Sequence, residues 1–217
     1  MLKNRIKRTA SLISAAFVLL TLLPFSAAVT AESGTLIRDG GMENTQFFSN
    51  SEVSCGWGYN NSCRAVLSEN YAAAGKSSAE VTSTSAGYAT LSYNGITAEK
   101  NTDYILSFLL YIESAGEKDF RYSVLSGTKY VDSVKNITVS GNTGEWITVT
   151  KEFNSGAYTD LTLQLCPYGS GVYYIDSVYM GKRIDNPVYI SAAAENGGYI
   201  YGAEAGIPYA AGSEVTV

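Results

Sequence analysis

Hydrophobic and polar residues alternate with a period of two through most of the chain after residue 60. No segment has the 3.6-residue period of an amphipathic helix. The alternating stretches are rich in β-branched and aromatic residues, and turn signals such as Asn94-Gly95 and Gly127 separate them. They predict strands at residues 35–38, 64–67, 79–82, 88–93, 103–112, 120–125, 130–139, 146–153, 161–166 and 172–180. Strands of this length and spacing predict an all-β fold, a two-sheet antiparallel β-sandwich of about 150 residues.

The alternation also predicts which face of each strand meets the core. In the stretch 104–110, the even-numbered residues, such as Leu106 and Phe108, share one hydrophobic face. In the stretch 161–166 the leucines point inward, which leaves Gln164 and Cys166 on the opposite face. Trp146 has the opposite parity to the core-facing residues of its strand.

The last predicted strand has a carboxylate where a hydrophobic residue is expected. Strict alternation over 172–180 places Asp176 on the same face as Tyr174 and Val178. Burying a lone carboxylate costs several kcal/mol, so Asp176 would need a partner. A cation shared with a second carboxylate from the turn at 39–43 would provide one, and the first and last strands would meet there. The alternative is that Asp176 points into solvent at a strand end.

The first 31 residues are predicted to be a signal peptide. Basic residues, including Lys3 and Arg5, precede an apolar run at 12–23, and small residues follow at 29–31. The run is shorter than the ~20 residues of a membrane span. We therefore predict export with cleavage before Glu32, no membrane span, and a secreted or cell-surface protein whose residues 32–184 form the sandwich.

The amino-acid composition excludes several classes of catalytic and binding site. The 217 residues include 17 Tyr and 21 Gly but no His, and the formal net charge is −5. The lack of His excludes Ser-His-Asp and Cys-His catalytic systems and His-ligated metal sites. A negative chain without a basic patch argues against nucleic acid. The acidic residues that a glycoside hydrolase would need, such as Glu113, Glu145 and Asp160, lie mostly in turns without a pairing motif, so no enzyme is predicted.

The chain has three cysteines. Cys55 and Cys63 flank a short loop, and an exported protein permits a disulfide between them, although their pairing stays open. Cys166 lies in a predicted strand and is most simply a small buried hydrophobic residue.

The composition changes after Arg183. Asn186-Pro187 marks a linker, and short strands are predicted at 188–192, 198–201 and 213–217. Strands so few and short cannot close a core. Residues 185–217 are therefore expected to be a linker and the start of a small second domain, with further domains downstream. They resemble the opening of the small β-repeats of bacterial surface proteins.

Six short motifs occur in an order typical of one group of proteins. They are Asp39–Glu43 (Asp-Gly-Gly-Met-Glu), Gly56-Trp57, Gly75–Ser78, Tyr104–Ser107, Asn142–Trp146 (Asn-Thr-Gly-Glu-Trp) and Tyr174–Val178 (Tyr-Ile-Asp-Ser-Val). Together they resemble the jelly-roll carbohydrate-binding modules of families 4, 9 and 22, which accompany xylanases and other glycanases. The chain departs from that pattern at Met42, where Phe is usual, and at Ser177, where a second Asp is usual.

This resemblance implies a jelly roll with a structural Ca²⁺ and a sugar site. The calcium ligands at matching positions are Glu43, Asp176 and the main-chain carbonyl of Lys76, in agreement with the argument about Asp176, since Ca²⁺ prefers six to eight oxygens. The sugar site would lie on the concave sheet or its rim, where rings stack on sugars and polar groups bind hydroxyls. The candidates are Tyr88, Tyr122, Gln164, Tyr111, Arg121, Tyr59 and Tyr168. Trp57 and Trp146 are expected to be structural.

The sequence thus leads to one main hypothesis and one alternative. The main hypothesis is a non-catalytic carbohydrate-binding module of a secreted bacterial protein, which binds plant or microbial polysaccharide, xylan or another β-glycan, through exposed tyrosines. The alternative is an adhesin or spacer β-sandwich without glycan binding, because most rings in a Tyr-rich sandwich simply pack against their neighbours.

Overall fold

The computed structural model describes residues 34–44, 48–49, 56–84, 86–115, 119–138, 144–186, 188–189 and 208–209. These residues form strands, turns and loops without a helix. Consequently the described part of the chain has no helix with the length and apolar character to cross a membrane. The predicted signal peptide at 1–31 lies outside these residues.

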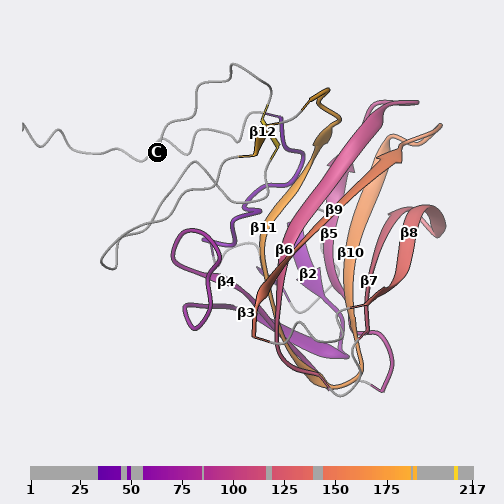
Figure 1. The fold of residues 1–217 in the computed structure, drawn as a ribbon. Coiled ribbons are helices and arrows are strands. Elements are labelled where there is room, and N and C mark those ends of the chain that lie inside the picture. Colours follow the sequence, from indigo (N-terminus) through magenta and orange to yellow (C-terminus); the bar gives the residue numbers. More distant parts are fainter. Residues whose placement is uncertain are drawn as a thin grey trace, which may run out of the picture. The chain divides into compact units, whose positions relative to one another are not determined.

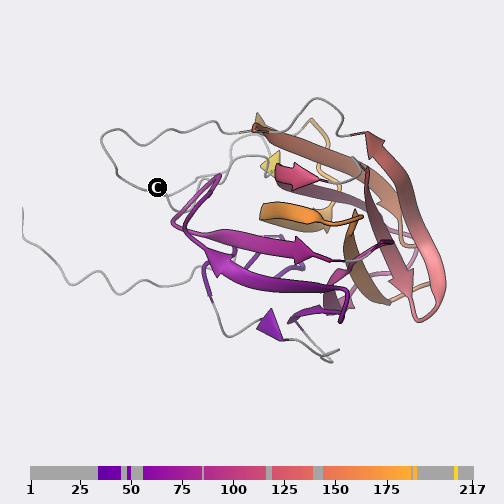
Figure 2. The ribbon, with the colours of Figure 1, turned by 90° about the horizontal axis from the view of Figure 1, so that it is seen from below.

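The described strands form two large sheets that stack face to face (Figure 1, and from below in Figure 2). The six-stranded sheet has the order β1 (Phe48–Ser49), β2 (Gly56–Tyr59), β5 (Leu91–Thr97), β10 (Asp160–Tyr168), β7 (Asp119–Ser126), β8 (Lys129–Thr138). The five-stranded sheet has the order β3 (Cys63–Ser68), β4 (Ser78–Ser83), β11 (Gly171–Lys182), β6 (Asp103–Ala115), β9 (Trp146–Asn154). All neighbours pair antiparallel except β1 and β2. The predicted all-β sandwich is confirmed.

A third, small pairing joins β12 (Val188–Tyr189) and β13 (Pro208–Tyr209) in antiparallel fashion. The first of these strands lies within the predicted strand at 188–192. The predicted strands at 198–201 and 213–217 lie outside the described residues. Within the sandwich, β2 was missed, because its Gly-Trp-Gly-Tyr sequence has the composition of a loop.

The core lies between the inner faces of the two sheets. Leu106, Phe108 and Leu110 of β6 are fully buried, as the alternation predicts, and so are the leucines of β10. Trp57 is also fully buried and packs edge-on against Tyr93, with 5.1 Å between ring centroids. Each such side chain contributes about 1.5–3 kcal/mol through burial of its apolar surface. The structural role expected for Trp57 is confirmed.

Asn94-Gly95 lies inside β5 and forms a bulge instead of the predicted turn. Leu161 lies opposite Ile96 and Leu163 lies opposite Tyr93, so two residues of β5 oppose a single residue of β10. The glycine supplies the positive φ of 76° that such a bulge needs. The turn prediction was wrong because a Gly with positive φ serves both structures equally well.

A second bulge interrupts β11 and changes the expected faces. Asp176 lies opposite Leu109 and Tyr179 lies opposite Ser107, so β11 carries one extra residue between these pairs. Ser177 sits in this bulge with a φ of 50°, which is uncommon outside glycine.

The bulge reverses the alternation along β11. Ile175 before it and Val178 after it both belong to the core, whereas Asp176 lies on the outer face of the five-stranded sheet. The prediction that Asp176 and Val178 share a face was therefore wrong. The side chain of Asp176 is nevertheless fully buried, because the loop between β3 and β4 covers it.

The beginning of the described chain meets its last long strand. The N–H of Leu36 donates to the carbonyl of Met180 at 2.6 Å, and the N–H of Val178 donates to the carbonyl of Gly40 at 2.9 Å. A Cβ at Gly40 would lie 1.9 Å from the carbonyl oxygen of Val178, so only glycine fits there. The predicted strand at 35–38 is reduced to one bridge at Thr35, but its predicted contact with the last strand is confirmed.

Candidate functional site

Asp176 accepts hydrogen bonds from a loop that lies over it. Its Oδ2 accepts from the N–H of Ala73 at 2.8 Å and from the N–H of Ala74 at 3.1 Å. Its Oδ1 accepts from the N–H of Ser177 at 2.6 Å, the bulged residue of β11. These main-chain donors stabilise the ionised form of the buried carboxylate.

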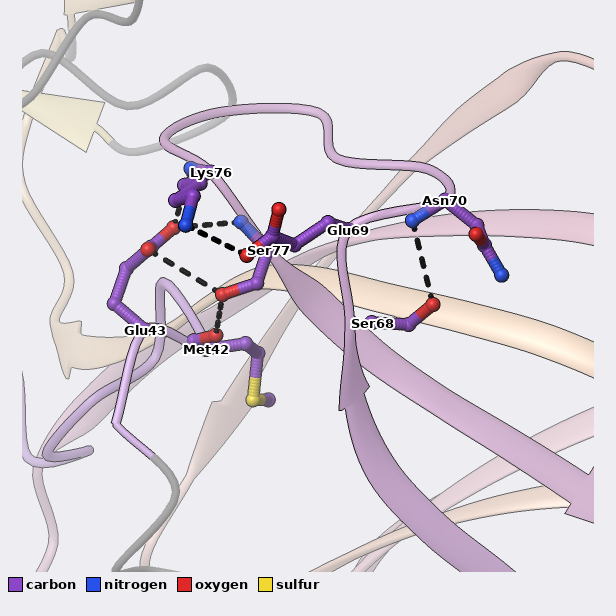
Figure 3. Close-up of polar contacts among 7 residues, drawn as sticks. All are labelled: Met42, Glu43, Ser68, Glu69, Asn70, Lys76 and Ser77. Carbon is purple, nitrogen blue, oxygen red and sulfur yellow. Dashed lines mark hydrogen bonds and ion pairs between the residues drawn. The ribbon is translucent and has the colours of Figure 1, made fainter.

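Glu43 binds the next residues of the same loop (Figure 3). Its Oε1 accepts from the N–H of Lys76 at 2.8 Å and from the N–H of Ser77 at 3.1 Å. The hydroxyl of Ser77 donates to the carbonyl of Met42 at 2.8 Å. Gly75 has a φ of 62°, which favours glycine in this turn, and a Cβ there would lie 2.1 Å from Oε1 of Glu43. We call Glu43, Asp176 and the loop 73–77 the carboxylate clamp.

The two carboxylates of the clamp repel one another. Burial raises the pKa of Asp176 to about 7, although three main-chain N–H groups lower it, and the charge of Glu43 raises it further. Asp176 is buried and Glu43 is exposed, so the buried carboxylate is the one that a proton or a nearby cation would stabilise.

The carboxylate oxygens of the clamp are ligands of the kind that Ca²⁺ prefers, and main-chain N–H groups already donate to Oδ1 and Oδ2 of Asp176 and Oε1 of Glu43. Oε2 of Glu43 lies 3.3 Å from the hydroxyl of Ser77, whose proton is donated to the carbonyl of Met42, and therefore keeps lone pairs for a cation. Among the described residues, no group of three or more Cys, Asp or Glu side chains gathers in one place. A Ca²⁺ ion would therefore need main-chain carbonyls and water to reach six ligands. Lys76 contacts Glu43 through its N–H, and the role of its carbonyl stays a prediction.

The predicted sugar-binding residues begin with Tyr88, which pairs with Tyr168 in an isolated β-bridge. Their rings meet edge to face, with centroids 4.7 Å apart. The guanidinium carbon of Arg121 lies 4.1 Å from the centroid of the Tyr88 ring, a cation–π contact. Tyr88 is half-buried. The sequence predicted a ring open to sugar, but the planar guanidinium covers one face of the ring.

Arg121 carries an unsatisfied donor. Its Nε is buried and has no hydrogen-bond partner within the part of the chain that the structure describes. Its Nη2 donates a long hydrogen bond of 3.9 Å to Sγ of Cys166, which lies opposite on β10. An unpartnered guanidinium N–H is a donor that a ligand oxygen would satisfy.

Gln164 lies one step further along the same outer face. It is half-buried on β10 between Ser92 of β5 and Ser123 of β7. Gln164 and Cys166 lie on the same face of β10, and Cys166 lies opposite Arg121. We call Tyr88, Arg121, Gln164, Cys166 and Tyr168 the Arg121 face.

Cys166 is buried in this face, as predicted for a small apolar residue. Burial raises the pKa of its thiol, although the charge of Arg121 lowers it. Cys63 also carries a free, buried thiol, and Cys55 lies outside the described residues.

Tyr122 does not belong to the Arg121 face. The ring is 1% exposed and lies in the core, and its hydroxyl donates to Asp132. Because successive residues of a strand point to opposite faces, Arg121 outward requires Tyr122 inward. The prediction of Tyr122 as an exposed sugar contact was wrong. Tyr59 likewise lies on the inner side, where it is half-buried and packs against the core.

Tyr111 lies on the other sheet. It belongs to β6, and its ring stacks on Tyr71, with centroids 4.4 Å apart, and contacts Trp146 at 5.5 Å. Tyr111 and Tyr88 were predicted to share one site, but they lie on the outer faces of different sheets. Tyr71 was missed altogether, because a lone tyrosine in a loop carries no periodic signal.

No protein-family model matches the chain, and no curated protein matches it. Solved structures do match. A putative sugar binding protein from Bacteroides thetaiotaomicron has 11% identity and a TM-score of 0.54, over 69% of this chain and 100% of that chain. The structure of carbohydrate-binding module 2 of family 16 has 15% identity and a TM-score of 0.50, over 67% of this chain and 99% of that chain. These likenesses concern the fold: the chain has the jelly-roll β-sandwich of carbohydrate-binding modules.

Proposed function

We propose that the chain is a non-catalytic carbohydrate-binding module that binds a polysaccharide on the Arg121 face. The observation that carries the proposal is the guanidinium of Arg121, stacked on Tyr88 with a buried Nε that lacks a partner in the described residues. Aromatic rings beside planar polar groups are what a sugar ring requires, since it offers C–H faces and hydroxyls together. The shared fold is consistent with this function but does not carry it.

Each residue of the face has a role in this proposal. The guanidinium of Arg121 and the amide of Gln164 bind sugar hydroxyls, while the ring of Tyr168 contacts the C–H face of a sugar. A shallow site of this kind would give a Kd of tens of µM, about −6 kcal/mol. Xylan or another β-glycan is the expected ligand class.

The proposal includes a structural Ca²⁺ in the carboxylate clamp, held by Glu43, Asp176 and main-chain oxygens. The ion would stabilise the ionised form of Asp176, whose pKa is raised mainly by burial and further by the charge of Glu43. It would tie the start of the sandwich to its last long strand, and it takes no part in sugar binding.

We further propose that residues 1–31 direct export, that residues 32–184 form the binding module, and that residues 185–217 lead to downstream domains. The module would then tether a longer secreted or surface protein to polysaccharide.

Affinity electrophoresis tests the function directly. The protein is run in gels containing xylan, β-glucan, mannan or starch, with a gel lacking polysaccharide as control. We expect retardation by at least one β-glycan and no release of reducing sugar. Unchanged mobility in every gel would contradict the proposal and favour a spacer without glycan binding, and release of reducing sugar would contradict the non-catalytic assignment.

A further inference from the structure

Three aromatic residues form a row across the outer face of the five-stranded sheet. Tyr174 of β11 lies opposite Tyr111 of β6, and Tyr111 lies opposite Trp146 of β9. The ring centroids are 6.0 Å and 5.5 Å apart along this row. The outer face of an antiparallel sheet is commonly polar, so one ring on each of three neighbouring strands requires an explanation.

A fourth ring comes from the loop between β3 and β4. Tyr71 stacks on Tyr111 with an interplanar angle of 24°, and it meets Tyr174 edge to face, with 4.8 Å between centroids. Tyr174 is closed off and only 2% exposed. Tyr71, Tyr111 and Trp146 all remain half-buried, so the row keeps exposed ring surface.

Two carboxylates stand beside the rings. The hydroxyl of Tyr174 lies 3.3 Å from Oε2 of Glu80 and 3.1 Å from Oε2 of Glu113. A bulge in β6 brings Glu113 there: Val172 lies opposite Ser114 and Tyr173 opposite Ile112, so Glu113 is the extra residue. One hydroxyl has a single proton to donate, so the two carboxylates keep lone pairs for other donors.

We propose that this row is a second carbohydrate-binding surface, for a chain of neutral pyranoses. Trp146 and Tyr111 lie on neighbouring strands, which are about 4.8 Å apart, close to the length of one sugar unit, so these two rings match two successive sugars. Trp146, Tyr111 and Tyr71 contact the C–H faces, and Glu113 and Glu80 accept hydrogen bonds from hydroxyls. The two carboxylates repel uronates, which fixes the ligand as uncharged. The surface lies across the core from the Arg121 face and binds independently of it.

Tryptophan fluorescence measures binding at this row independently of the Arg121 face. Of the two tryptophans in the chain, Trp57 is fully buried in the core, whereas Trp146 is half-buried in the row. The chain is titrated with cellohexaose, xylohexaose and mannohexaose, and with an oligogalacturonate of the same length as the anionic probe. We expect a saturable change in emission with at least one neutral probe and none with the oligogalacturonate.

Single-residue variants test whether the change in tryptophan emission comes from binding at the row. Tyr111→Ala is expected to weaken binding at least tenfold, and Glu113→Gln, which alters an exposed side chain and is compatible with folding, about threefold or more. Arg121→Gln and Tyr130→Ala, both outside the row, should leave the titration unchanged. The proposal is overturned by the absence of a saturable change with all three neutral probes up to millimolar concentration. It is also overturned by equal binding of the oligogalacturonate, or by unaltered affinity in both row variants.

Discussion

Glu43 and Asp176 hold the same short loop from two sides. Glu43 accepts the N–H groups of Lys76 and Ser77, and Asp176 accepts those of Ala73 and Ala74. One residue lies at the start of the sandwich and the other in its last long strand, so the loop joins both ends of the fold. The carboxylate clamp therefore holds the start of the sandwich, the loop 73–77 and β11 together.

Replacing Asp176 by Ala should destabilise the protein by about 1–3 kcal/mol, because three main-chain N–H groups would lose their buried acceptor. Thermal unfolding measures the change. Asp160→Ala is the matched control, since Asp160 is an exposed carboxylate on β10 and should alter the melting temperature little. Equal melting temperatures for the two variants would contradict the importance of the clamp.

The clamp predicts an unusual pH dependence in chelator. The pKa of Asp176 is raised from 3.8 to about 7 by burial and by the nearby charge of Glu43. The folded state therefore keeps a proton between about pH 4 and pH 7 that the unfolded state has released. The contribution of this group to stability is thus present at low pH and is lost as the pH rises through about 7.

Calcium should reverse this loss, because a bound cation stabilises the ionised form of Asp176. We expect the melting temperature in EDTA to fall between pH 5 and pH 8, and millimolar Ca²⁺ to restore it at pH 8. Asp176→Asn should remove both responses. If Ca²⁺ and EDTA give identical melting curves at pH 8, the calcium proposal fails.

Gly40→Ala should be among the most damaging single substitutions, because the new Cβ would lie 1.9 Å from the carbonyl oxygen of Val178. Main chain cannot easily move aside, so we expect a loss of at least about 1–3 kcal/mol. Gly127→Ala is the control variant, because it introduces backbone strain without a steric clash. Gly127 has a φ of 55° with open space around it, so its substitution should cost only about 1 kcal/mol. Similar unfolding free energies for the two variants would argue against the close approach.

Tyr122→Phe tests the correction to the sugar-binding residues. The substitution removes the hydrogen bond to Asp132 and should cost about 1 kcal/mol of stability. Because the ring is buried, it should leave polysaccharide binding unchanged in affinity electrophoresis. Lost retardation by a stably folded Tyr122→Phe protein would return Tyr122 to the binding site.

The sequence predicted the strands well, since alternation marks residues such as Leu106 and Phe108 directly. It also paired Glu43 with the region of Asp176 through the resemblance of the end motifs. The sequence pattern did not reveal the bulges at Asn94-Gly95, Glu113 and Ser177, because one extra residue reverses the faces without changing the composition. The same lack of a local signal hid the contact between Tyr71 and Tyr111.

The candidate sugar site was predicted only in part. Gln164 was correctly placed on the outer face, because the extra residue of the nearby bulge lies in β5 and the alternation of β10 is not interrupted. Tyr122 was placed wrongly, since a strand rich in tyrosine offers no contrast between its two faces. The stacking of Arg121 on Tyr88 joins a residue of β7 to one in an isolated bridge before β5, and no pattern within one strand reveals it.

The most direct test of the account is isothermal titration calorimetry of the polysaccharide that retards the protein in gels. Arg121→Gln and Gln164→Ala should each weaken binding at least tenfold, because they remove the donors of the Arg121 face. Tyr130→Ala, which removes an exposed ring on β8 outside that face, should bind as the unaltered protein does. Unchanged affinity in both face variants, with their melting temperatures preserved, would contradict the proposed sugar site.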